Sequence, residues 1–199
     1  MGDFTIGTKA VLSQSGSDEA VLSGDVNLES ATFPAGHVVW VNSVHKSDVL
    51  SLTQAVGTLV DITDMTLTTP TPASSSSKYL ISTSLAFGMA GDTTHIYTYI
   101  HRSISGGASG VVTGANGTVV GTRTGAWGIS NSMASPEQRY TSQQYLDSPS
   151  SSTAITYKLQ WHGGGGSPVA YLNRSSRDND GAAYDGRATS SFTIMEIAG

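Results

Sequence analysis

The chain has 199 residues and a formal net charge of −5, and only 13% of its residues are charged, against roughly 25% in an average soluble domain. It contains no cysteine, which excludes disulfides, thiolate metal sites and cysteine nucleophiles. The pI near 5.4 and the scattered basic residues argue against a nucleic-acid partner, because nucleic-acid binding depends on clustered lysine and arginine. A chain of this length can bury a substantial core in one β-sandwich domain.

Residues 1–31 differ in pattern from the rest of the chain. Their apolar residues are separated by short polar pieces, and no apolar run is long enough for a signal peptide or a membrane span, so no membrane insertion is expected. We expect an extended N-terminal arm that anchors the protein on a partner, and residues 32–199 as the folded domain. The anchor candidates are Phe4, Ile6, Val11, Leu12, Val21 and Leu22.

From residue 32 onward the apolar residues recur mostly with a period of two, which is typical of β-strands. Strands are predicted at residues 37–44, 78–87, 95–101, 154–161, 168–172 and 188–198. Weaker candidates are residues 49–52, 57–63, 110–113, 118–122 and 127–131. No stretch has a helical period, and residues 133–140 are compatible with a single turn.

The connections contain residues that favour turns. Polar, proline-containing bridges are predicted at residues 69–78 and 148–152. Asn116-Gly117 stands between two pairs of valines and predicts a tight β-hairpin. The glycine run at residues 163–166 favours a tight turn between two strands, with a flexible ligand loop as the alternative interpretation.

The last predicted strand, residues 188–198, is largely apolar on both faces, which is typical of a strand in the middle of a sheet. One face carries Phe192, Ile194 and Glu196, and the other Thr193, Met195 and Ile197. Glu196 is expected either to face water at a sheet edge or to pair with an arginine such as Arg174 or Arg187, because unpaired burial is costly. About ten strands joined by turns predict an all-β, antiparallel, jelly-roll-like β-sandwich.

No arrangement of residues indicates catalysis. A Ser/His/Asp set can be drawn from any chain this rich in serine, so no enzyme, catalytic residue or cofactor is expected. His95 and His101 lie about 20 Å apart along one strand face, too far to share a metal within one chain, although one histidine from each of three subunits could meet at a threefold axis. Residues 178–181 resemble the start of a calcium loop, but Thr189 stands where the closing glutamate belongs, so a solvated turn is favoured and no metal is expected.

Three pieces of the sequence resemble a family of bacteriophage virion proteins, particularly those of marine and cyanobacterial phages. They are Thr32–Val39, Tyr145–Pro149 with Ile155–Gln160, and Phe192–Ala198. The family includes fibre-like and capsid-decorating proteins, and the resemblance runs from about residue 32 to residue 199. It implies a jelly-roll-like module, similar to the trimeric C1q and tumour-necrosis-factor folds, that assembles as a homotrimer on the virion.

Within this resemblance, several aromatic and apolar residues on strands with two apolar faces are expected either to fill the core or to pack between subunits. These trimer-interface or core candidates are Tyr97, Tyr99, Tyr157, Trp161, Phe192 and Ile194. Tyrosine also stacks well on sugars, which is the less supported role here.

Two functional classes compete. The first is a trimeric capsid decoration or cement protein, tied to the major capsid protein by its arm and exposed on the surface of a virion assembled in the host cytoplasm. The alternative is a tail-fibre or spike tip, joined to a tail component, that binds a host-surface receptor. A soluble cytokine-like or lectin-like module is a remote third class. The chain has no coiled-coil or repeat segment for a shaft, which favours the compact decoration protein.

Overall fold

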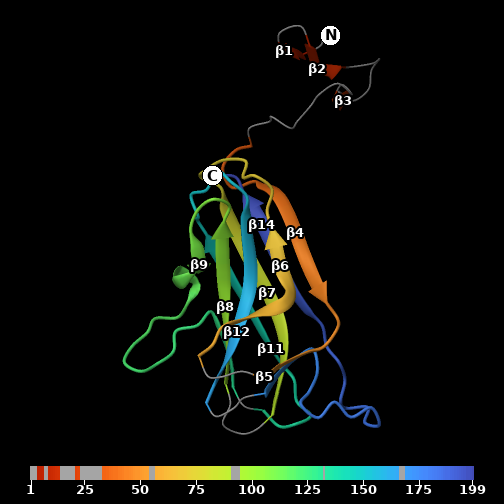
Figure 1. Cartoon of the computed structure of the whole chain (residues 1–199). Coiled ribbons are helices and arrows are strands. Elements are labelled where there is room, and N and C mark those ends of the chain that lie inside the picture. Colours follow the sequence, from red (N-terminus) through yellow and green to blue (C-terminus); the bar gives the residue numbers. More distant parts are fainter. Residues whose placement is uncertain are drawn as a thin grey trace. The chain divides into compact units, whose positions relative to one another are not determined.

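The computed structural model (Figure 1) describes residues 33–53, 57–90, 95–131, 133–165 and 169–199, and the backbone of three short strands before them. The chain divides into two compact units, Met1–Phe33 and Pro34–Gly199. The three strands of the first unit form an antiparallel sheet and are β1 (Phe4–Ile6), β2 (Lys9–Ser13) and β3 (Val21–Leu22). The anchor candidates belong to these strands, but their side chains lie outside the described residues, so the anchor stays a prediction.

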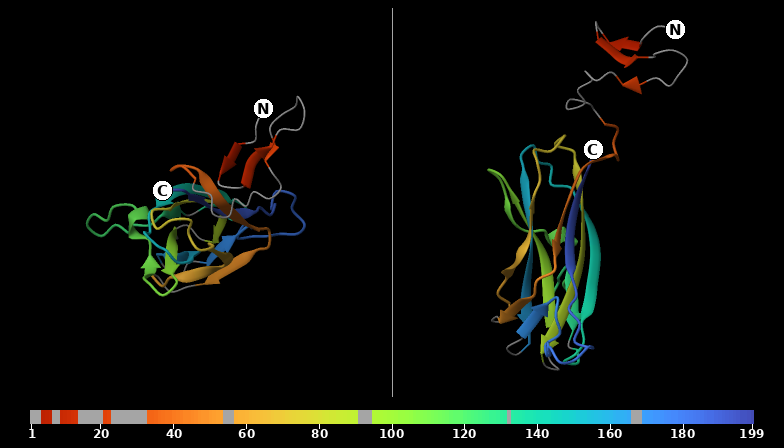
Figure 2. Two further views of the ribbon diagram at one scale, coloured as in Figure 1. Left: turned by 90° about the horizontal axis from the view of Figure 1, so that it is seen from above. Right: turned by 90° about the vertical axis from the view of Figure 1, so that its right-hand side faces the viewer.

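The second unit is a sandwich of two antiparallel sheets, whose layers are seen from the side in Figure 2. Sheet 1 contains β4 (Val38–Lys46), β14 (Ser190–Ile197), β7 (Lys78–Ala90) and β11 (Arg139–Asp147), in that spatial order, and is extended along β7 by β13 (Val169–Leu172) and β5 (Leu50–Thr53). Sheet 2 contains β6 (Val60–Thr68), β12 (Ile155–Gly164), β8 (His95–Ile104) and β10 (Gly128–Asn131), with β9 (Ser109–Val111) also paired to β8.

The strand pairing is nested along the chain. β4 pairs with β14, β6 with β12, β7 with β11, and β8 with β10, so that the outermost pair in the sequence encloses the next one. Eight antiparallel strands wrapped in this way into two sheets make a jelly roll. The predicted fold class, an all-β antiparallel sandwich of jelly-roll type, is therefore confirmed.

The core fills the space between the sheets with alternate residues of each central strand. Aromatic rings meet across the two layers: the ring centroids of Tyr79 and Tyr157 are 5.8 Å apart, and those of Phe87 and Trp161 are 5.9 Å apart. Such tilted pairs add to the free energy gained from burial. Four of the residues singled out in the sequence lie in this core, with almost no exposed surface: Tyr157, Trp161, Phe192 and Ile194.

The hairpin predicted at Asn116-Gly117 is wrong. β9 and β10 both pair with the same edge of β8 and do not pair with each other as a hairpin. Between these two strands the chain turns away from β8 through a 3₁₀ turn at Thr113–Ala115. Val112 N–H donates to the Ile100 carbonyl, so the first valine pair already bonds to β8 and is not free to form a hairpin with the second pair. The second pair, Val119-Val120, is exposed and not in a strand. In the described residues no helix is long and apolar enough to cross a membrane.

The predicted glycine turn begins later than expected. Gly163 and Gly164 belong to β12, and the left-handed backbone that marks the turn occurs at Gly165, with φ +77°. Gly164 is needed within the strand because a Cβ there would lie 2.4 Å from Cε2 of Tyr97. The glycine thus lets the Tyr97 ring lie against the backbone of the neighbouring strand.

Candidate interaction surface

The outer face of sheet 1 has no charged side chain in its central rows, and Lys78 is exposed on it at the first position of β7. It is formed by the alternate residues of β4, β14, β7 and β11 that point away from the core. The pairing register arranges them in rows, which are Val41, Met195, Leu80 and Leu146; Ser43, Thr193, Ser82 and Gln144; and His45, Ser191, Ser84 and Ser142. None of these residues is an aspartate, glutamate, lysine or arginine.

The first row is apolar across all four strands. Val41 and Leu146, at its two ends, are 55% and 45% exposed, and Met195 and Leu80 between them are half-buried. Isolated exposed apolar residues are ordinary, but a continuous row on a sheet face is typical of a surface that meets another protein.

The next two rows are polar and uncharged, and their short hydroxyl side chains bond to one another. Ser43 Oγ lies 2.7 Å from Thr193 Oγ1, and Ser142 Oγ donates to Ser84 Oγ at 3.1 Å. These pairs reduce the number of hydroxyls that a partner would have to satisfy on burial. The two hydroxyl rows therefore add little to the free-energy cost of removing this surface from water.

The outer face of sheet 2 differs in charge. Asp61 accepts hydrogen bonds from Lys158 and Gln160, each at 2.7 Å. Burial raises the pKa of Asp61, but these bonds outweigh it and hold the pKa below its ordinary value. The pKa of His101 is lowered by burial and by the nearby Lys158. This face therefore carries a charged patch at its centre, unlike the three rows on sheet 1.

Two of the predicted trimer-interface or core candidates, Tyr97 and Tyr99, lie on this outer face of sheet 2. The Tyr99 ring stacks on His162, with centroids 5.4 Å apart and planes 17° apart, and its hydroxyl lies 3.1 Å from His162 Nε2. Burial raises the pKa of Tyr99. Tyr97 packs on the same imidazole at 5.1 Å.

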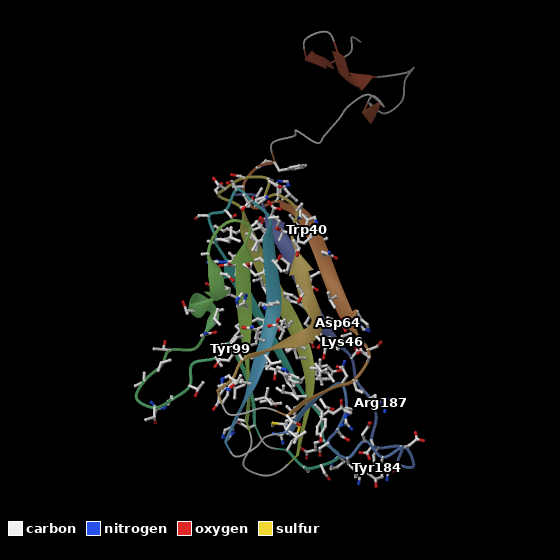
Figure 3. All side chains as sticks on the ribbon, in the orientation of Figure 1. Trp40, Lys46, Asp64, Tyr99, Tyr184 and Arg187 are labelled. Atoms are coloured by element: carbon white, nitrogen blue, oxygen red, sulfur yellow. The ribbon has the colours of Figure 1, made fainter. Side chains whose placement is uncertain are left out.

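The loop after β13 holds the residues compared with a calcium loop. Figure 3 shows its Tyr184 and Arg187 at the end of the sandwich opposite Trp40. Asp178 is bound by two arginines, Arg174 and Arg187, and its hydrogen bonds with Arg187 keep its pKa below the ordinary value. The carboxylate oxygens of Asp178 therefore form ion pairs with these arginines. Among the residues with described side chains, no group of three or more histidines and carboxylates could hold a metal.

Both expectations for Glu196 are wrong. Its side chain points into the sandwich and is 1% exposed, so it does not face water. It also does not pair with Arg174 or Arg187. Both of these bind Asp178, and Arg187 lies at the end of the sandwich opposite Trp40, which pairs with Glu196. Instead its carboxylate accepts the backbone N–H of Ala73 at 2.7 Å, which ties the bridge between β6 and β7 to the last strand.

No known family model matches the chain, and no curated protein matches it either. Similar solved structures include infectious bursal disease virus, Gx strain, with 10% identity and a TM-score of 0.41, and T=1 particles derived from infectious bursal virus, with 12% identity and a TM-score of 0.44. Each covers 94% of this chain, whereas the matches cover 42% and 44% of the viral chains. The chain thus spans less than half the length of these proteins, and its membership of the phage family stays a prediction.

Proposed function

We propose that this protein is a structural, non-enzymatic component of a bacteriophage virion. It is a capsid decoration or cement protein that assembles as a homotrimer, and residues 1–31 hold it to the coat. The observation that carries the proposal is the set of three uncharged rows on the outer face of sheet 1. The location on a virion and the trimeric state are inferred from the resemblance of the sequence to phage virion proteins.

The chemistry of this face suits a permanent contact between protein surfaces. Charged residues are depleted at the centre of protein interfaces because removing a charge from water costs more than an imperfect pair returns. The apolar row from Val41 to Leu146 supplies the area that gains from burial, and the hydroxyl rows add little desolvation cost.

Ring closure sets a further requirement. A trimer needs a contact between two different surfaces of neighbouring subunits, whereas a face that meets its own copy gives a dimer. In this proposal the outer face of sheet 1 packs against a surface of the next subunit other than the charged outer face of sheet 2. Association also stabilises a chain that has no disulfides, because each subunit binds only the folded state of its neighbours.

The solution mass of the full chain tests the trimer. Size exclusion with light scattering is expected to give three times the chain mass of 20.6 kDa. Thr193→Lys places a charge at the centre of the uncharged rows and should shift the protein to monomer. The matched control, Thr156→Lys, makes the same change on the central strand of sheet 2 and should leave the trimer intact. A monomeric wild type, or a Thr193→Lys variant that stays trimeric, would contradict the proposal.

Immunogold labelling of intact virions tests the location. Label scattered over the head supports decoration, and label confined to the tail supports the tail-fibre alternative. Removal of residues 1–31 is expected to leave folded trimers that no longer attach to particles, because the core strands all belong to the second unit.

A further inference from the structure

A hollow of about 370 Å³ lies on the outer face of sheet 2, where β8 and β10 run side by side. The pairing register sets Tyr97 beside Ile129 and His95 beside Asn131, so these side chains form its floor. Its rim is Arg123 with its two threonine neighbours, from the excursion that separates β9 and β10. The hollow is thus built from two strands and one loop of the second unit.

Arg123 differs from the other arginines. Each of them is paired with a carboxylate, and they are Arg102, Arg139, Arg174, Arg177 and Arg187. In the part of the chain that the structure describes, Arg123 has no carboxylate within ion-pair distance, and its side chain is exposed at the hollow. A guanidinium presents a planar fork of donors that matches a carboxylate.

The floor combines an aromatic ring with polar groups. The Tyr97 ring is fixed by His162 on the next strand and by the edge of His95, with centroids 5.1 and 6.2 Å away. Ile129 beside it is 47% exposed. A rigid ring next to an aliphatic side chain suits the C–H face of a sugar ring, which is apolar on one side and carries hydroxyls at its rim.

Donors and acceptors for hydroxyl groups stand at the other end of the floor. The Asn131 amide lies opposite His95, and the threonines flank Arg123. A ligand with several hydroxyls can bond to these groups together.

We propose that this hollow binds an acidic saccharide. The Tyr97 and Ile129 side chains contact the C–H face of one sugar unit, Asn131 and the two threonines bond its hydroxyls, and Arg123 pairs with its carboxylate. The net charge of −5 disfavours general attraction of anions, so binding depends on this local cation. The site goes beyond the proposed structural role, because it gives the protein a means of adsorbing to charged glycans.

Chemical-shift titration of the full, isotope-labelled protein tests the site. The probes are galacturonic acid, N-acetylneuraminic acid and neutral galactose, each to about 10 mM, which covers the millimolar affinities usual for single sugars. At least one acidic sugar is expected to shift the resonances of Tyr97, Ile129 and Asn131 at lower concentration than galactose does. Arg123→Gln should weaken that binding at least tenfold, and Asn131→Ala should also weaken it.

The control is Arg139→Gln, the same substitution at an exposed arginine on sheet 1, which should bind like the wild type. Shifts elsewhere on the surface, equal binding by Arg123→Gln, or no binding of either acidic sugar would overturn the proposal. Full displacement by an equal concentration of sodium sulfate, with unchanged binding by Asn131→Ala, would show an anion site only and would also overturn it. None of these outcomes depends on the trimer, so the two proposals fail separately.

Discussion

Nζ of Lys46 lies 2.9 Å from Oδ2 of Asp64, and this ion pair joins the edge strands of the two sheets, β4 and β6 (Figure 3). The lysine side chain is 2% exposed, whereas Asp64 and its second partner, Asp48, are 68% and 69% exposed. Asp64 has φ +65° and lies where the register of β6 against β12 is irregular. The cation is therefore buried at the open edge of the sandwich, and two carboxylates reach it from the water side.

This asymmetry predicts which partner is costlier to remove. Burial alone would lower the pKa of Lys46, but its bonds to Asp48 and Asp64 outweigh burial and raise that pKa. The double variant Asp48→Asn/Asp64→Asn leaves a buried cation without a counter-charge, so it should lose more stability than Lys46→Met, which leaves only exposed carboxylates. Urea unfolding at pH 7 measures both. The opposite order would show that the carboxylates contribute little.

Asn173 should be the most sensitive polar residue of the sandwich. It is fully buried, its Nδ2 donates to the carbonyls of Lys46 and Asp48 at 2.9 and 2.8 Å, and its Oδ1 accepts from Ser190 at 2.6 Å. Asn173→Ala is expected to cost about 3 kcal/mol or more, because buried partners are left unsatisfied.

Glycine at the same position separates the two contributions. Asn173 has φ +64°, a conformation that costs alanine about 1 kcal/mol more than glycine. Asn173→Gly should therefore unfold at a higher urea concentration than Asn173→Ala, although both fall below the wild type. Equal midpoints would show that the backbone conformation has no share in the effect.

Alkaline pH should weaken the fold through two core tyrosines. Burial, followed by the charge of Glu196, raises the pKa of Tyr79 to about 12. Burial also raises the pKa of Tyr157, together with the charge and hydrogen bond of Asp147. The folded state thus holds the phenol protons more tightly than the unfolded state, whose pKa is about 10. The resulting stability is complete below pH 10 and is lost as pH rises towards and past 12.

Unfolding midpoints at pH 8 and pH 11, with absorbance at 295 nm to follow phenolate, check this prediction. The tyrosines with exposed hydroxyls should ionise first, and Tyr79 and Tyr157 should ionise only when the protein unfolds. Tyr79→Phe should flatten the decline in stability above pH 10. A stability that stays constant between the two pH values would contradict the mechanism.

Gly164→Ala should displace the Tyr97 ring. Its Cβ would lie 2.4 Å from Cε2 of that ring, so the ring must swing towards the hollow, at a cost of about 1–3 kcal/mol. Gly186→Ala is the matched control, because its Cβ would meet nothing within 4 Å, and it should stay within about 0.5 kcal/mol of the wild type. The Tyr97 ring resonances and the unfolding midpoint distinguish the two variants.

The strands with clear alternation were predictable from local sequence. β14 lies in the middle of sheet 1, with Phe192 and Ile194 in the core, as its two apolar faces indicate. β11 was missed because its centre is polar on both faces, with Ser142 and Gln144 outward and Gln143 inward. Only its pairing with β7 makes this segment a strand, and that information is not local.

Pairing between distant segments also explains why the composition of the two sheet surfaces could not be predicted from the sequence. The uncharged rows combine residues from four strands far apart in the chain, so their lack of charge emerges only once the register is known. The turn chemistry of Asn116-Gly117 was outweighed by the edge of β8, which binds Val111. The isolated cation Arg123 could be identified only after the other arginines had found their partners.

The pairing of β4 with β14 has a consequence for biosynthesis. β4 is translated early, yet the strand that covers its inner edge leaves the ribosome last among the described strands. Until then β4 exposes its backbone donors and acceptors to any other chain nearby. Such a topology folds slowly, within about milliseconds to seconds, and is completed only after β14 has left the ribosome. Nascent chains on neighbouring ribosomes therefore have time to exchange β14 segments, and low temperature or slow expression should reduce aggregates.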